Sequence, residues 1–151
     1  MGYNTHGKGF TEVMDEIDMN KLPKIVAVDF DGTLVEDRFP EIGKPFTEMF
    51  DICTALKRCG VKIILWTSRD NDTAARNLDA AVEFCRSMGL EFDAVNQNIP
   101  ETIAMFHNDT RKVYADIYID DKSIPCSQAP IFWAQKLGLT WTRFTGFADE
   151  S

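Results

Sequence analysis

One stretch constrains the fold more than any other: residues 25–34, which read IVAVDFDGTL. Its opening apolar run shows no polar alternation, which is typical of a strand covered on both faces in a parallel sheet. The run ends at Asp29, and open α/β sheets bind ligands outside the carboxyl ends of their strands. Side chains two residues apart on extended backbone point the same way. Asp29 and Asp31 can therefore face one ligand, while Gly32 lets the chain turn away.

Two other structures can begin with this pattern. Asp-Gly is a common hairpin turn, and the stretch alone leaves that alternative open. A calcium-binding loop also starts with acids at alternate positions, but it needs glycine at its sixth place. Gly32 is the fourth residue counted from Asp29, so the calcium loop is excluded. Partners at other strand ends favour a strand-end site over a hairpin.

Such partners follow two further apolar runs. Residues 61–66 (VKIILW) lead into Thr67-Ser68, and residues 117–119 (IYI) lead into Asp120-Asp121. Apolar residues at helical spacing separate the runs. Strand–helix alternation with polar clusters at strand ends predicts an α/β, Rossmann-like, doubly wound fold with a mainly parallel sheet.

The segments between these runs have their own signals. Pro45 at the first turn and Gly60 at the stop predict a helix over residues 45–60. Apolar residues at roughly helical spacing and Gly89 at the stop predict a second helix over residues 78–89. Residues 92–98 are expected to contain a short strand, and residues 99–110, which have no clear period, a loop. The loop 35–44 follows the acid pair directly and is expected to overhang the site as a flap.

The sequence also predicts how the chain divides into an N-terminal extension and one domain. Residues 1–24 are mixed and polar, and we expect an N-terminal extension with one short amphipathic helix. Residues 25–151 are expected to form a single domain, which closes with a helix over residues 129–137 and an edge strand over residues 139–144.

Composition excludes several classes of function. The net charge of -8, from 16 basic and 24 acidic residues, disfavours a nucleic-acid partner. The four cysteines form no CxxC pair and have no histidine beside them, which argues against zinc. No apolar segment has signal or membrane length, so we expect a reduced, cytoplasmic protein with no membrane partner.

Acids at two strand ends favour a hard cation. Magnesium prefers a few carboxylate oxygens, and Asp29 with Asp120 or Asp121 would supply them. The cation would also remove the repulsion between the carboxylates. An ionised Asp29 beside a metal can attack phosphorus and form an aspartyl-phosphate. Asp31 is then placed to protonate the leaving oxygen and later to deprotonate water.

Thr67 and Ser68 suit a phosphate seat, because hydroxyls and free amides lie at a strand end. Ser68 can instead cap the next helix. We expect Arg69 to pair with an acid or cap a helix rather than to touch substrate. A lysine would offset the phosphate charge, with Lys112 as first choice, followed by Arg111 and Lys122.

These residues carry a family resemblance. Residues 29–33 (DFDGT) resemble the DxDGT nucleophile motif of the haloacid dehalogenase superfamily of phosphatases. Thr67, Lys112 and the Asp120-Asp121 pair resemble its second, third and fourth motifs, in that order. The resemblance implies that Asp29 is the nucleophile, that Thr67 and Lys112 bind phosphate, and that Asp120 and Asp121 serve magnesium.

The resemblance also implies that Asp31 is the acid/base and that its backbone carbonyl is a further metal ligand. One spacing departs from the pattern: Lys112 lies eight positions before Asp120, closer than in many members.

Members of that superfamily often carry a cap domain between motifs. Here only positions 32–66 and 68–111 separate the motifs, which leaves no room for one. The resemblance therefore implies a capless, open site, screened by the loops 35–44 and 96–110 or by a neighbouring subunit of a homo-oligomer.

The sequence thus predicts a magnesium-dependent phosphomonoester hydrolase with a phosphorylated small molecule as substrate. A phosphatase acting on nucleic-acid ends or phosphoproteins is an alternative, because the open site permits it. A non-catalytic metal- or phosphate-binding module is another, although a pure binder would not need the second carboxylate, Asp31.

Overall fold

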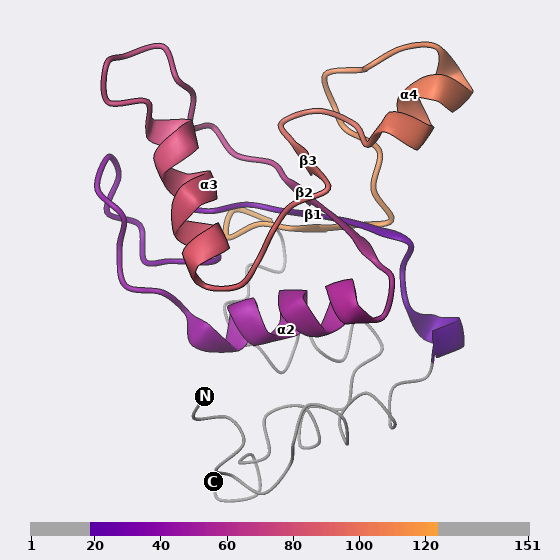
Figure 1. Cartoon of the computed structure of the whole chain (residues 1–151), viewed down its shortest axis with the longest axis horizontal. Coiled ribbons are helices and arrows are strands. Elements are labelled where there is room, and N and C mark those ends of the chain that lie inside the picture. The colour runs from indigo at the N-terminus through magenta and orange to yellow at the C-terminus, as the bar shows by residue number, and fades with distance from the viewer. Residues whose placement is uncertain (1–18, 124–151) are drawn as a thin grey trace, which may run out of the picture.

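The computed structural model describes residues 19–123 (Figure 1). The helix expected before residue 19 and the elements expected at 129–137 and 139–144 lie outside the described residues. The described chain opens with a short 3-10 turn, η2 (Met19–Lys21), which leads into the first strand.

A single sheet of four parallel strands organises this part of the chain. The strands are β1 (Ile25–Val28), β2 (Lys62–Leu65), β3 (Ala94–Val95) and β4 (Ile117–Ile119), and their order is β3-β2-β1-β4. The chain winds outward from β1 to β3 and then returns to the other side of β1. The winding therefore reverses between β1 and β4, where sheets of this kind bind ligands.

Both faces of the sheet are covered, and helices lie on either side of it (Figure 1), which confirms the predicted doubly wound α/β fold. Helices α2 (Thr47–Arg58) and α3 (Asn77–Ser87) pack on the face that presents Val26 and Val28. The chain around α4 (Pro100–Phe106) packs on the face that presents Ile25 and Ala27. Figure 1 shows α2 and α4 on opposite sides of the sheet. Because β1 is covered on both faces, all four of its residues are buried.

The expectation of a loop over residues 99–110 is wrong, because α4 lies there. Pro100 occupies its first turn, where the missing N–H of proline costs nothing. The helix buries only Thr102, while Met105 and Phe106 are largely exposed. A helix without an apolar face has no apolar period, so the pattern could not reveal it.

Two aspartates fix the opposite edge of the sheet, where the strands begin. Asp116 Oδ2 accepts hydrogen bonds from the Lys24 and Ile25 backbone N–H groups, both at 2.9 Å. Asp93 Oδ2 accepts one from the Ile63 N–H at 2.7 Å. These bonds hold the register of the strands, and the register sets which residues meet at the carboxyl edge.

The side chain of Asn98 is buried and forms hydrogen bonds with the segment between α4 and β4. Its Nδ2 donates to Asp109 Oδ1 at 2.8 Å, and its Oδ1 accepts from the Tyr114 N–H at 2.7 Å. We expect Asn98→Ala to lower the free energy of unfolding by roughly 2 kcal/mol, because buried polar groups lose their partners. Urea denaturation measures this change. The exposed Asn108→Ala is the matched control, and equal stabilities of the two variants would contradict the prediction.

Candidate active site

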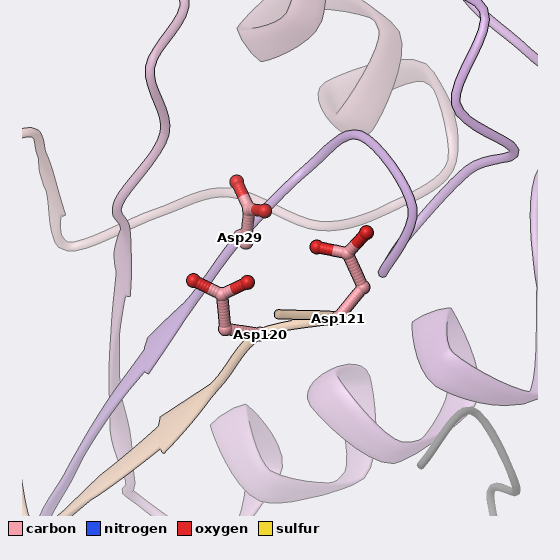
Figure 2. Close-up of side chains that lie close together, drawn as sticks. All are labelled: Asp29, Asp120 and Asp121. Carbon is pink, nitrogen blue, oxygen red and sulfur yellow. The ribbon is translucent and has the colours of Figure 1, made fainter. Parts of the chain in front are cut away.

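Three carboxylates meet where β1 and β4 end. Asp29 follows β1, and Asp120 and Asp121 follow β4 (Figure 2). One oxygen of each lies within 4.8 Å of the others. The Asp29 N–H donates to the Ile119 carbonyl at 2.9 Å, so the two strands stay paired up to the cluster. A donor set made only of carboxylate oxygens suits a hard divalent cation better than zinc or copper.

The surroundings of Asp29 disfavour its charge. Burial raises the pKa of Asp29 to about 7; the Phe30 N–H opposes this rise, and the charges of Asp120, Asp121 and Asp31 add to it. Burial also raises the pKa of Asp121, and its hydrogen bond with Asp120 acts in the same direction. A bound cation would reverse this preference by favouring the ionised carboxylates.

Gly32 and Thr33 fit closely around Asp121. The backbone of Gly32 has φ +83, and a Cβ atom there would lie 2.2 Å from Asp121 Oδ2. The buried Thr33 accepts a hydrogen bond at Oγ1 from the Asp121 N–H at 3.0 Å. The end of the DFDGT stretch therefore positions the last acid of the cluster. Sequence reasoning missed this role of Thr33, although its place in the motif was a signal.

The cluster opens into a cavity of about 650 Å³, which Asp31 and Asp37 also line. Its other lining residues are hydroxyl-bearing, aromatic or basic: Phe39, Trp66, Thr67, Ser68, Arg69 and Lys122. Asp37 and Phe39 belong to residues 35–44, called here the flap loop, so this loop overhangs the site as expected. In residues 19–123, the connections between strands contain the flap loop and helices but no cap domain.

Thr67 and Ser68 both reach this cavity, as the sequence predicts. Asn96, which follows β3, accepts a hydrogen bond at Oδ1 from the Thr67 N–H at 2.8 Å. Thr67 Oγ1 in turn accepts from the Arg69 N–H at 3.1 Å. No residue within 19–123 accepts the hydroxyl proton of Thr67, so this proton can be donated to a ligand. Sequence reasoning missed Asn96, although a polar residue at the third strand end was a usable signal.

Asp31 lines the cavity, but its carboxylate is bound to Arg69. Arg69 Nε donates to Asp31 Oδ2 and Nη2 donates to Asp31 Oδ1, each at 2.8 Å. Arg69 is only 2% exposed. The expectation that Arg69 pairs with an acid is thereby confirmed.

The structure does not bring Lys112 to this cavity. Its Nζ lies 5.2 Å from the centre of the Tyr118 ring, and it lines a separate cavity beside α4. Lys112 precedes β4, and the chain enters β4 at the edge where β1 begins, since the Asp116 N–H donates to the Ile25 carbonyl. Lys122, which follows β4, lines the site instead, with Nζ 3.6 Å from Asp121 Oδ2. Arg111 is exposed and lines neither cavity.

Fold and site together define an α/β protein with an acidic cluster at the reversal point of a parallel sheet. The solved structure of a conserved protein from Bacteroides thetaiotaomicron resembles it, with 34% sequence identity and a TM-score of 0.63. The match covers 81% of this chain and 96% of that chain. This chain therefore belongs to the same family as that conserved protein.

Two other comparisons gave no match: no family model fits the sequence, and no curated protein resembles it. Among the helices of residues 19–123, none has the length and apolar character needed to cross a membrane.

Proposed function

We propose that this protein is a magnesium-dependent phosphomonoester hydrolase of the haloacid dehalogenase type. The observation that carries the proposal is the meeting of Asp29 with Asp120 and Asp121, within 4.8 Å, in the cavity that Thr67 lines. A carboxylate nucleophile, a hard-cation site and a hydroxyl donor in one cavity are what phosphoryl transfer through an aspartyl-phosphate requires.

The reaction would proceed in two steps. In the first, an oxygen of Asp29 attacks phosphorus, the bond from phosphorus to the leaving oxygen breaks, and that oxygen takes a proton from Asp31. In the second, Asp31 takes a proton from water, whose oxygen attacks phosphorus, and phosphate leaves as Asp29 is regenerated. Thr67 would hold a phosphoryl oxygen through its hydroxyl proton. Each Asp31 oxygen accepts one hydrogen bond from Arg69 at rest and keeps a second lone pair, which could carry the transferred proton.

Magnesium fits the donor set, with Asp29, Asp120 and Asp121 as the side chains that would hold it. It would neutralise charge that builds up on the phosphoryl oxygens. The Asp31 side chain, which is occupied by Arg69, lies outside this ligand set.

The charge of the cavity favours a small phosphorylated substrate over a polyanion. Among residues 19–123, five carboxylates line it against two basic side chains, Arg69 and Lys122, and Arg69 is already bound to Asp31. A nucleic-acid end would need a basic surface around the site. Arg69 contributes nothing to such a surface because it is buried. The charge of Arg38 is paired, since its Nη2 lies 3.5 Å from Glu36 Oε1.

The test is phosphate release from p-nitrophenyl phosphate with magnesium and with EDTA. We expect turnover by the wild type that EDTA removes and that Asp29→Asn loses, with a fall of at least about 10³-fold because the nucleophile is gone. The exposed Asp72→Asn is the matched control and should behave as wild type. A wild type that neither turns over nor binds beryllofluoride with magnesium would instead be a binding module.

The two candidate lysines give a separate prediction. We expect Lys122→Ala to raise KM about tenfold, because a charge-assisted hydrogen bond to phosphate is lost. Lys112→Ala should leave KM within about twofold, since Lys112 lines a different cavity. Steady-state kinetics of both variants measure the difference, and a larger effect from Lys112→Ala would assign the phosphate to that lysine.

A further inference from the structure

We propose that Arg69 is a positioning residue that ties the flap loop to Asp31. One guanidinium group would then set both the orientation of the acid/base carboxylate and the position of the loop over the substrate. The link to catalysis rests on the proposed function, whereas the link to the flap loop does not.

The hydrogen bonds of Arg69 account for all of its side-chain donors. Nε and one Nη2 hydrogen go to the two oxygens of Asp31, both at 2.8 Å. The other Nη2 hydrogen goes to the Glu41 carbonyl at 2.9 Å. Nη1 donates to the Pro40 carbonyl at 3.2 Å and to the Asn77 carbonyl, at the start of α3, at 3.4 Å. A guanidinium has five N–H donors, and here each has an acceptor.

The guanidinium also lies over two aromatic rings. Arg69 Cζ lies 4.9 Å from the centre of the Phe30 ring and 5.1 Å from that of Phe39. Phe39 is 57% exposed and lines the cavity, so Arg69 supports a side chain that a substrate would meet. Lysine, with its compact ammonium group, cannot make the paired bonds and the two ring contacts together.

This arrangement exceeds what stability requires. A buried ion pair is often no better for stability than well-packed apolar residues. Here Arg69 instead joins three segments: the turn after β1 through Asp31, the flap loop through two carbonyls, and the start of α3 through one. Arg69 therefore ties the flap loop to Asp31, and we expect the two to keep the same relative position.

The kinetic test compares Arg69→Gln, Arg69→Lys and Asp31→Asn on p-nitrophenyl phosphate with magnesium. We expect Arg69→Gln to lower kcat by about 10²-fold, because a misplaced catalytic group loses that much. Arg69→Lys should recover part of the loss. Both Arg69 variants should raise KM, because the flap loop loses its anchor, whereas Asp31→Asn should lower kcat by about 10²- to 10⁴-fold with little change in KM.

The double variant separates positioning from a general structural effect. If Arg69 acts through Asp31, then Asp31→Asn/Arg69→Gln should have the same kcat as Asp31→Asn alone. Arg86→Gln is the matched control, since Arg86 is an exposed arginine on α3 that pairs with Glu83. An undiminished effect of Arg69→Gln in the Asp31→Asn background would overturn the assignment.

A readout without activity keeps the two proposals distinguishable. Hydrogen exchange of residues 36–44 should speed up in Arg69→Gln and stay at the wild-type rate in Arg86→Gln. Unchanged exchange in Arg69→Gln would overturn the link to the flap loop. A wild type without turnover or beryllofluoride binding would overturn the proposed function and the catalytic link, while the exchange result would still decide the anchoring role.

Discussion

Replacing Gly32 with alanine should remove most of the affinity of the proposed magnesium site while leaving a folded chain. The new Cβ atom would lie 2.2 Å from Asp121 Oδ2 and 2.7 Å from its Cγ. Contacts this short cannot exist, so the Asp121 carboxylate or the Gly32 backbone must shift, and either shift disturbs the cluster. We expect affinity to fall on the order of 10- to 100-fold, as it does when groups that orient metal ligands are lost.

Gly60→Ala is a close control for this variant, because both glycines have positive φ. Gly60 has φ +90, and a Cβ atom there would meet nothing within 4 Å. Each substitution carries the backbone cost of about 1–2 kcal/mol, but only Gly32→Ala disturbs Asp121. The rise of Tm on adding magnesium measures the difference, since a cation that binds only the folded state stabilises it. Equal rises in the two variants would show that Asp121 does not hold the cation.

The carboxyl edge of the sheet could be predicted from sequence because its signals are local. Strands β1, β2 and β4 are apolar runs that end abruptly in polar residues, and parallel strands end at the same edge. The convergence of Asp29 with the Asp120-Asp121 pair can therefore be predicted without knowing the directions of the side chains. Thr67 reaches the same cavity for the same reason.

The remaining contacts of the site depend on the paths of loops, which cannot be predicted from the spacing of residues in the sequence. Arg69 could have pointed to solvent, and only the course of the flap loop brings the Pro40 and Glu41 carbonyls to it. Lys112 precedes β4 and Lys122 follows it, both within a few residues, yet of these two only the lysine after the strand lines the cavity.

Without a cation, the charge of Asp29 should cost stability in a pH-dependent way. Burial raises its pKa from 3.8 to about 7, so the unfolded chain releases this proton first. Stability is therefore highest below about pH 4 with respect to this group, and it is lost as the pH rises through about 7. In EDTA at about pH 8, we expect Asp29→Asn to raise the free energy of unfolding by about 2 kcal/mol. This is roughly half of the free energy that corresponds to the pKa shift, because Asp29 is partly exposed to solvent that screens its charge. An equal increase in the free energy of unfolding at pH 4.5 and pH 8 would show that the charge of Asp29 is not the cause.

Magnesium at the proposed site should reverse this pH dependence, because it would bind the ionised form of Asp29. Binding must release the proton that Asp29 holds, so affinity should rise about tenfold between pH 6 and pH 8 and then level off. Titration calorimetry in two buffers of different ionisation enthalpy measures both the affinity and the released proton. Asp29→Asn has no proton to release, and its residual binding through Asp120 and Asp121 should show no such rise. If wild type bound magnesium equally at both pH values and released no proton, Asp29 would not be a ligand, and the cation would have to be held by the two aspartates after β4 alone.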